Sequence, residues 1–183
     1  MLSELEHLSV SKKGKKTMNK KQRPRLQIIR GLPGSGKTTL ALKRYPQLMR
    51  IETDMYFNRK GAYRFTMDNN IRACEWFQEQ VDIMCWDGMD FVVTGVLAAH
   101  TERLDEVVET ANHYGYDIYI KTLTSQYKGI HGVPKEHFEG MKKAFCSEND
   151  LKIKYKKLKR VHFGLMPTKY PLAHLQKKGN KSK

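Results

Sequence analysis

Cysteine is scarce in this chain of 183 residues, and the three cysteines, Cys74, Cys85 and Cys146, stand far apart. None of them belongs to a Cys-x-x-Cys pair, so neither a zinc-binding motif nor a disulfide framework is indicated. Long hydrophobic runs are missing as well, because no segment approaches the roughly 18–20 apolar residues of a membrane-spanning helix or the apolar core of a secretory signal. We therefore expect a soluble cytoplasmic protein with unpaired thiols, located in the host cytoplasm if the protein is viral.

Acidic residues are also few, and their distribution divides the chain. The 19 Asp and Glu residues face 34 Lys and Arg residues, which gives a formal net charge of +15. Residues 1–25 hold eight basic and two acidic residues, residues 150–183 hold eleven and one, and residues 26–149 hold fifteen and sixteen. We predict a flexible basic arm over 1–25, a nearly neutral folded domain over 26–149, and a basic C-terminal extension over 150–183.

Basic tails of this kind attract a polyanion, because each lysine near a phosphate releases a counterion. We expect a nucleic-acid partner, DNA in the first place, that binds through the tails. A membrane partner is not expected, because the lysine-rich stretch 12–21 lacks interleaved apolar anchors. For residues 150–183, one more strand or helix packed on the domain is an equal alternative. The sequence holds no signal for the oligomeric state.

The clearest motif lies between an apolar stretch, Leu26–Ile29, and a helix-compatible stretch, Thr39–Arg44. It has the Gly-x-x-x-x-Gly-Lys-Thr spacing of a phosphate-binding loop. Glycines let backbone N–H groups point at phosphate oxygens, where the positive end of the next helix dipole also lies. The predicted ATP-binding residues are Gly31, Leu32, Pro33, Gly34, Ser35, Gly36, Lys37, Thr38 and Thr39. Among them, Lys37 is expected to reach the β and γ phosphates and Thr38 to ligate Mg²⁺.

Strand and helix patterns alternate after this motif. Short apolar strands are predicted at 48–51, 91–93 and 116–123, and helices at 71–85, 101–115 and 134–145. This alternation predicts an α/β fold of the P-loop NTPase type, with a parallel sheet flanked by helices. Residues 124–133 lie between the last of these strands and the last helix, and we expect them to form a lid over the nucleotide.

Several candidate site residues follow predicted strands, where ligands of such folds bind. Asp54 comes after the second strand, beside the strand that carries the phosphate loop. We expect Asp54 to be the general base that takes the proton of the acceptor hydroxyl. Arg59 and Arg64 are expected to bind phosphates of the acceptor. Lys128 in the lid is expected to stabilise charge on the transferred phosphoryl group.

Three segments narrow the assignment: residues 30–41, Thr53-Asp54-Met55-Tyr56-Phe57, and Ile130-His131-Gly132-Val133-Pro134. With these segments, residues 26–146 resemble the P-loop kinases related to the 5′-hydroxyl polynucleotide kinases, a branch that includes phage kinases of modified DNA. The resemblance implies a kinase that uses ATP and Mg²⁺. It also implies a general base after the second strand, which is the position of Asp54.

The sequence departs from that family at two places. Family members usually carry an acidic or amide residue with a threonine at the end of strand three, where this chain reads Val93-Thr94-Gly95-Val96. Asp90 lies at the opposite end of that strand, so Mg²⁺ is left with Thr38, phosphates, water and Asp54. The family lid commonly offers an arginine where this chain has Lys128, which keeps the charge but not the bidentate donor fork.

The leading hypothesis is an ATP-dependent kinase that transfers the γ-phosphate to a hydroxyl on DNA. The expected acceptor is the hydroxymethyl group of a modified pyrimidine, 5-hydroxymethyluracil, as in phage-type DNA hypermodification. The alternatives are a 5′-hydroxyl polynucleotide kinase, a small-molecule kinase, and a nucleotide-dependent DNA-binding module with little catalysis. The aromatic residues Tyr56, Phe57, Tyr63 and Phe65 are expected either to stack on an acceptor base or to pack in the core.

Overall fold

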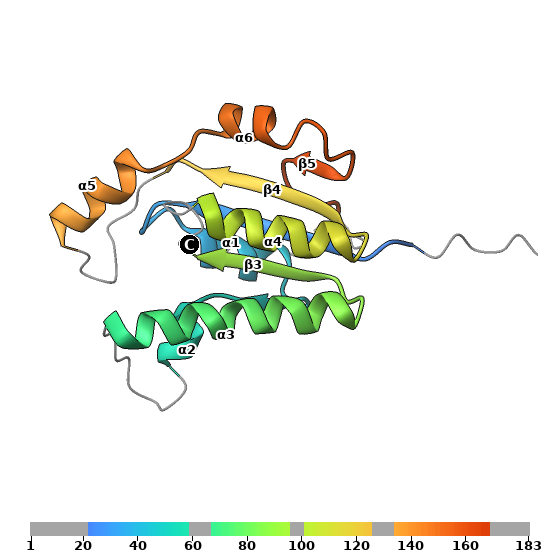
Figure 1. Cartoon of the computed structure of the whole chain (residues 1–183), viewed down its shortest axis with the longest axis horizontal. Helices are drawn as coiled ribbons and strands as arrows, with labels where there is room; N and C mark the ends of the chain where they lie inside the picture. The colour runs from blue at the N-terminus through green and yellow to red at the C-terminus, as the bar shows by residue number, and fades with distance from the viewer. Residues whose placement is uncertain (1–21, 59–66, 96–100, 126–133, 169–183) are drawn as a thin grey trace, which may run out of the picture.

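A five-stranded parallel sheet forms the centre of the protein in the computed structural model, which describes residues 22–58, 67–95, 101–125 and 134–168 (Figure 1). The strands are β1 (Arg25–Gly31), β2 (Met49–Ile51), β3 (Phe91–Gly95), β4 (Asp117–Leu123) and β5 (Val161–Phe163). They lie in the order β2-β3-β1-β4-β5, and each neighbouring pair is parallel. The predicted α/β fold with a parallel sheet is confirmed. The expectation that the strand before Asp54 lies beside the strand of the phosphate loop is wrong, because β3 lies between β2 and β1.

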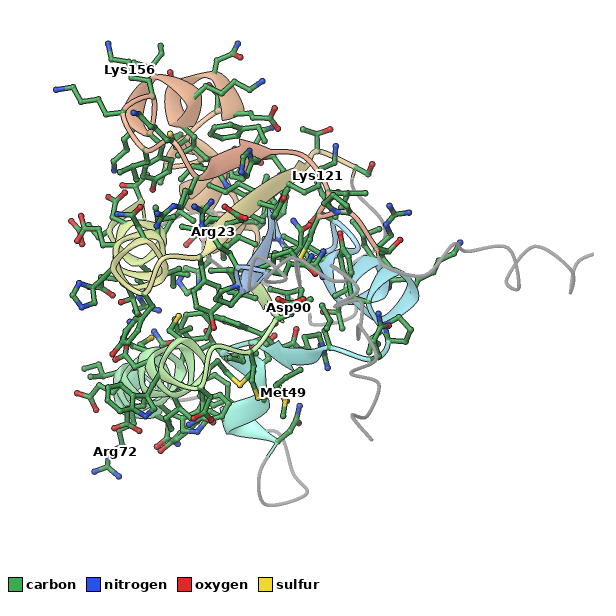
Figure 2. The ribbon with its side chains drawn as sticks, turned by 90° about the vertical axis from the view of Figure 1, so that its right-hand side faces the viewer. Arg23, Met49, Arg72, Asp90, Lys121 and Lys156 are labelled. Carbon is green, nitrogen blue, oxygen red and sulfur yellow. The ribbon has the colours of Figure 1, made fainter. Side chains whose placement is uncertain are left out.

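Helices flank both faces of this sheet. The described helices are α1 (Lys37–Arg44), α2 (Asp54–Phe57), α3 (Met67–Trp86), α4 (Thr101–His113), α5 (Lys135–Lys143) and α6 (Glu148–Lys154). Figure 2 looks at the sheet from its amino edge and shows α3 and α4 on one side and α1 on the other. At the opposite, carboxyl edge, the arrowheads of β3 and β4 point towards the side on which α5 lies (Figure 1).

Strand β1 is buried along its whole length and separates two apolar cores. Leu26 and Ile28 lie in the larger core with residues of α3, α4 and α6, whereas Ile29 packs with Ala41 of α1 in the smaller one. Successive side chains of a strand point to opposite faces, so an apolar strand of this kind needs helices on both sides. The phosphate-loop motif therefore starts from the most protected strand of the sheet.

The fold continues beyond the domain boundary expected at residue 149. Leu151 of α6 is fully buried in the larger core, and β5 pairs with β4 through Ile118 and Val161. Ser147 and Asp150 form a reciprocal capping box that begins α6. The first part of the predicted basic extension thus adds a helix and a strand to the domain, because its apolar residues alternate with lysines at spacings that bury one side.

The long helix predicted around 71–85 is present as α3, and four apolar residues at its helical spacing are buried, namely Phe77, Val81, Met84 and Cys85. Its first turns differ from the pattern, because Ala73 is buried and Ile71 is 63% exposed. Residues two apart lie about 200° apart around a helix, so Ile71 and Ala73 face opposite sides. No helix in the described part of the chain combines the length and the apolar character needed to cross a membrane.

Candidate nucleotide site at the carboxyl edge

The phosphate-loop motif forms the turn between β1 and α1 at the carboxyl edge of the sheet. Gly34 (φ 77°) and Gly36 (φ 85°) adopt the left-handed backbone conformation that residues with a Cβ avoid. A Cβ at Gly31 would lie 2.4 Å from Ser35 Oγ and 2.7 Å from Leu123 O. All three glycines of the motif are therefore required by the path of the backbone in this loop.

Lys37 is the first residue of α1, and its ammonium group folds back over the loop. Its Nζ donates hydrogen bonds to Gly31 O and to Leu32 O, both at 2.9 Å. Burial lowers the pKa of Lys37, and the charges of Asp54 and Glu52 oppose that shift. One ammonium group thus lies in the field of two carboxylates that follow β2.

Glu52, the residue after β2, joins three elements at this edge. Its Oε2 accepts a hydrogen bond from Thr38 Oγ1 of α1 at 3.0 Å and another from Thr94 Oγ1 of β3 at 2.6 Å. Its Oε1 pairs with the guanidinium of Arg50. Only 14% of the Glu52 side chain is exposed, and Thr94 is fully buried. Glu52 is therefore an oriented carboxylate in direct contact with the phosphate-loop threonine.

Glu52 is missing from the residues predicted from the sequence, although one signal for it was present. It follows strand β2 directly and stands two residues before Asp54, so it lies at the same strand end. The sequence predicts a role for Asp54 alone, because the family pattern places the metal-side acid at the end of strand three.

Asp54 begins α2, after Thr53. A carboxylate in the first turn of a helix is favoured by the helix dipole. The end of β3 lies close to this helix start, because a Cβ at Gly95 would be 3.9 Å from Thr53 N. The phosphate loop, the end of β2 and the end of β3 therefore meet at one edge, as expected. The catalytic role of Asp54 stays a prediction.

Three predicted site residues, Arg59, Arg64 and Lys128, lie outside the described residues, and most of the predicted lid does too. Their roles stay predictions. Of the four aromatic residues considered for base stacking, Tyr63 and Phe65 also lie outside the described residues. The other two pack inward: Phe57 is buried, and the Tyr56 ring lies 6.1 Å from the ring of Trp76 in α3.

The oxygen atoms at this edge fit a magnesium ion. Mg²⁺ prefers oxygen ligands and is held in phosphoryl-transfer sites by one or two carboxylates together with substrate phosphates. The Thr38 hydroxyl and the Glu52 carboxylate are such ligands, and they stand beside the phosphate loop. The described residues contain no group of three or more His, Cys, Asp or Glu that could hold a metal ion.

Asp90 directly precedes β3 and lies at the amino edge of the sheet, as expected. Its Oδ2 accepts hydrogen bonds from Arg25 Nη2 at 2.6 Å and from Arg25 Nε at 3.1 Å. Figure 2 shows Asp90 at the edge nearest the viewer, which is the edge away from the phosphate loop. Asp90 therefore pairs with the first residue of β1 and does not take part in the candidate site.

Comparison with known proteins identifies the fold. An uncharacterized protein of Pasteurella multocida (strain Pm70) is 27% identical over 138 residues, which cover 67% of this chain and 77% of that protein. A chain of the Pnkp1/Rnl/Hen1 RNA repair complex matches 78% of this chain with a TM-score of 0.52 and 18% identity. A chain from another structure of the Pnkp1/Rnl/Hen1 complex matches 83% of it with a TM-score of 0.50 and 20% identity.

The fold is of the P-loop NTPase type. This chain covers 49% and 50% of those two solved chains, so it spans about half of their length. No protein-family model matches the sequence. The likeness to the solved chains concerns the architecture, and the chemistry has to be argued from the residues at the carboxyl edge.

Proposed function

We propose that this protein is an ATP-dependent phosphotransferase that moves the γ-phosphate of ATP to a hydroxyl group on DNA. The observation that carries the proposal is the grouping of the phosphate loop, Lys37, Glu52 and Asp54 at one edge of the sheet. The loop and the lysine suit the binding of a nucleoside triphosphate, and a nearby carboxylate suits proton removal from an attacking hydroxyl.

The proposed reaction is an in-line displacement at the γ-phosphorus. Loop N–H groups and Lys37 hold the β and γ phosphates and neutralise part of their charge. Asp54 accepts the proton of the acceptor hydroxyl while the hydroxyl oxygen forms a bond to the γ-phosphorus. The bond from that phosphorus to the bridging oxygen breaks, and ADP leaves with the electron pair. Mg²⁺ bound at Thr38 would neutralise further charge on the phosphate oxygens.

The acceptor side of the proposal rests on charge. The excess of basic over acidic residues lies outside 26–149, and such segments suit a phosphate backbone. We assign Arg59 and Arg64 to the acceptor phosphates and Lys128 to the transferred phosphoryl group. The favoured acceptor is the hydroxymethyl group of 5-hydroxymethyluracil in DNA, as in phage-type DNA modification, which requires the base to be flipped out or already unpaired.

A second candidate acceptor is a 5′-terminal hydroxyl. One observation favours it, namely that a solved chain of similar fold comes from the Pnkp1/Rnl/Hen1 RNA repair complex. A third candidate, a nucleotide-dependent DNA-binding module with little catalysis, is favoured by the end of β3, which carries Thr94 and Gly95 and no acidic residue.

Transfer of labelled phosphate separates these candidates. The full chain is incubated with γ-labelled ATP, Mg²⁺ and one of three acceptors: DNA that contains 5-hydroxymethyluracil and has both ends blocked, the matched thymine DNA with a 5′-hydroxyl, and the same thymine DNA with both ends blocked. We expect label in the first acceptor and none in the third. Label in the second acceptor alone would support phosphorylation of the 5′ end, and label in none of the acceptors would contradict a DNA kinase.

A further inference from the structure

Strand β3 lacks an acidic residue at its carboxyl end, and this leaves the metal side of the site without the charge that a kinase of this type needs. The strand ends in Thr94 and Gly95. Of the residues in α1 and β3 that reach this place, Thr38 and Thr94 offer only neutral hydroxyls. The structure, however, brings a carboxylate to the same place from the neighbouring strand.

That carboxylate belongs to Glu52, and its contacts are those of a metal-side acid. Thr38 Oγ1 donates its single proton to Glu52 Oε2 at 3.0 Å. Since a hydroxyl has one donor and two lone pairs, this bond leaves the lone pairs of Thr38 for a cation. The carboxylate therefore orients the threonine as a ligand and adds a negative charge beside it.

Thr94 fixes the position of this carboxylate. It is fully buried, and its hydroxyl donates to the same Oε2 atom at 2.6 Å, a short charge-assisted hydrogen bond. Residues Ile51 and Val93 are paired in the parallel ladder between β2 and β3, so Glu52 and Thr94 are the next residues on adjacent strands. The end of β3 thus supplies the support, and the end of β2 supplies the charge.

We propose that Glu52 is the acidic residue of the magnesium site, that it replaces from β2 the carboxylate missing from β3, and that Thr94 is its positioning residue. The inference rests on the proposed binding of a nucleotide but does not depend on the identity of the acceptor. When bound, the ion supplies positive charge for the phosphate oxygens. Glu52 and Thr38 are the residues of this chain that would hold it, directly or through water.

Arg50 is expected to make metal binding at Glu52 depend on the nucleotide. Its guanidinium pairs with Glu52 Oε1, the oxygen that the two threonines do not use, and the pair is 21% and 14% exposed. The positive charge of Arg50 opposes a cation at Glu52 when no nucleotide is bound. Nucleotide phosphates add negative charge at the loop and offset this repulsion, so metal and nucleotide are expected to bind together.

The test is metal binding to the full chain, measured without any turnover. Mn²⁺, a paramagnetic substitute for Mg²⁺, is titrated against protein with a non-hydrolysable ATP analogue, and free Mn²⁺ is followed by its electron paramagnetic resonance signal. We expect Glu52→Gln to weaken Mn²⁺ binding by about 10- to 100-fold, while binding of the analogue in EDTA is not weakened, because a negative charge near the phosphates has been removed. Thr94→Val should give a smaller loss, because the carboxylate stays but loses its orienting bond.

Two further variants sharpen the test. Glu109→Gln, which neutralises an exposed carboxylate on α4, serves as the matched control and should bind Mn²⁺ as the wild type does. Arg50→Gln should increase the affinity for Mn²⁺ in the absence of nucleotide. Undiminished Mn²⁺ binding by Glu52→Gln and Thr94→Val, or none by the wild type, would overturn the inference.

The outcomes also separate this inference from the proposed function. Mn²⁺ binding that depends on Glu52, together with no transfer of label to any acceptor, would contradict the DNA kinase and leave the metal site standing. Transfer of label to DNA, together with a Mn²⁺ affinity that does not depend on Glu52, would support the DNA kinase and contradict the role of Glu52 in the metal site.

Discussion

The two ends of strand β1 each carry a buried arginine, and their surroundings differ. Arg25, at the amino edge, donates through Nε and Nη2 to Asp90 and through Nη1 to Pro167 O at 2.9 Å. Arg30, at the carboxyl edge, donates through Nη2 to Cys146 O at 2.6 Å and lies 4.5 Å over the ring of Phe145. Among the described residues, Nε and Nη1 of Arg30 have no hydrogen-bond partner.

The two buried guanidinium groups differ in how completely their nitrogens are hydrogen-bonded. At the amino edge a buried guanidinium is fully paired, which is the arrangement that stability requires. At the carboxyl edge Arg30 is fully buried, and burial lowers its pKa against the opposing effects of Cys146, Tyr155 and Glu148. Thr122, its ladder partner on β4, also has a buried hydroxyl without a partner among the described residues. A buried and incompletely paired guanidinium is thus kept at the carboxyl end of β1, against Phe145 and Cys146, at a cost in stability.

The largest effect of a single substitution is expected at the carboxyl edge, where it should lower the rate of phosphoryl transfer and leave stability unchanged. Asp54→Asn removes the proposed proton acceptor but keeps the size and polarity of the side chain. We expect kcat to fall by about 10²- to 10⁴-fold, with little change in nucleotide affinity or in the free energy of unfolding. Label transfer under saturating ATP measures it. An unchanged kcat would remove Asp54 from the role of base.

The next effect is expected at the amino edge, on stability alone. Arg25→Met leaves Asp90, whose side chain is 20% exposed, without its partner. The backbone N of residue 25, 2.8 Å from Asp90 Oδ1, still donates to it, so only the ion pair is lost. We expect a loss of about 3 kcal/mol in the free energy of unfolding, measured by urea denaturation, and an unchanged affinity of the folded protein for ATP. The double variant Arg25→Met with Asp90→Leu should recover part of the loss, because no charge is then left unpaired.

Arg30→Met is the matched variant at the other end of β1. Replacing a buried and incompletely paired guanidinium by an apolar side chain of similar length should change the free energy of unfolding by no more than about 1 kcal/mol. Urea denaturation measures this change in the same way as for Arg25→Met. A loss of stability as large as that of Arg25→Met would show that the two edges do not differ in this way.

The smallest effect is expected outside both edges, in the basic arm. Replacing the six lysines of residues 12–21 by glutamine should make the salt dependence of DNA binding shallower by about 0.9 in log–log slope for each lost phosphate contact. Replacing Lys156 and Lys157, which are exposed after α6, is the comparison (Figure 2). A slope that does not respond to the arm would show that DNA binds elsewhere.

Much of the fold and of the nucleotide site could be predicted from the sequence, because the signals are local. The phosphate loop depends on glycines whose spacing is visible in the chain, and the strands are short apolar runs between turn residues. The joining of α6 and β5 to the sheet was one of two open alternatives, since a lysine-rich stretch with alternating apolar residues fits both. The buried face of α3 agrees with its apolar spacing at Phe77, Val81, Met84 and Cys85, and the sequence pattern is wrong only at Ile71, near the start of the helix.

Glu52 could not be assigned a role from the sequence, because its role depends on neighbours from other elements. Thr38 is 14 residues away in the chain and Thr94 is 42, and only the sheet order β2-β3-β1 brings them to one carboxylate. The incomplete pairing of Arg30 could not be predicted either, because its partner Cys146 is 116 residues away in the chain.

The most direct test of the difference between the two edges is stabilisation by nucleotide. Urea unfolding is measured with and without the Mg²⁺ complex of a non-hydrolysable ATP analogue, at a hundredfold excess over its Kd. We predict a gain of about 2.7 kcal/mol for the wild type and an equal gain for Arg25→Met. Lys37→Met, at the same analogue concentration, should lose most of the gain. Equal gains in all three proteins, or none in the wild type, would contradict a nucleotide site at the carboxyl edge.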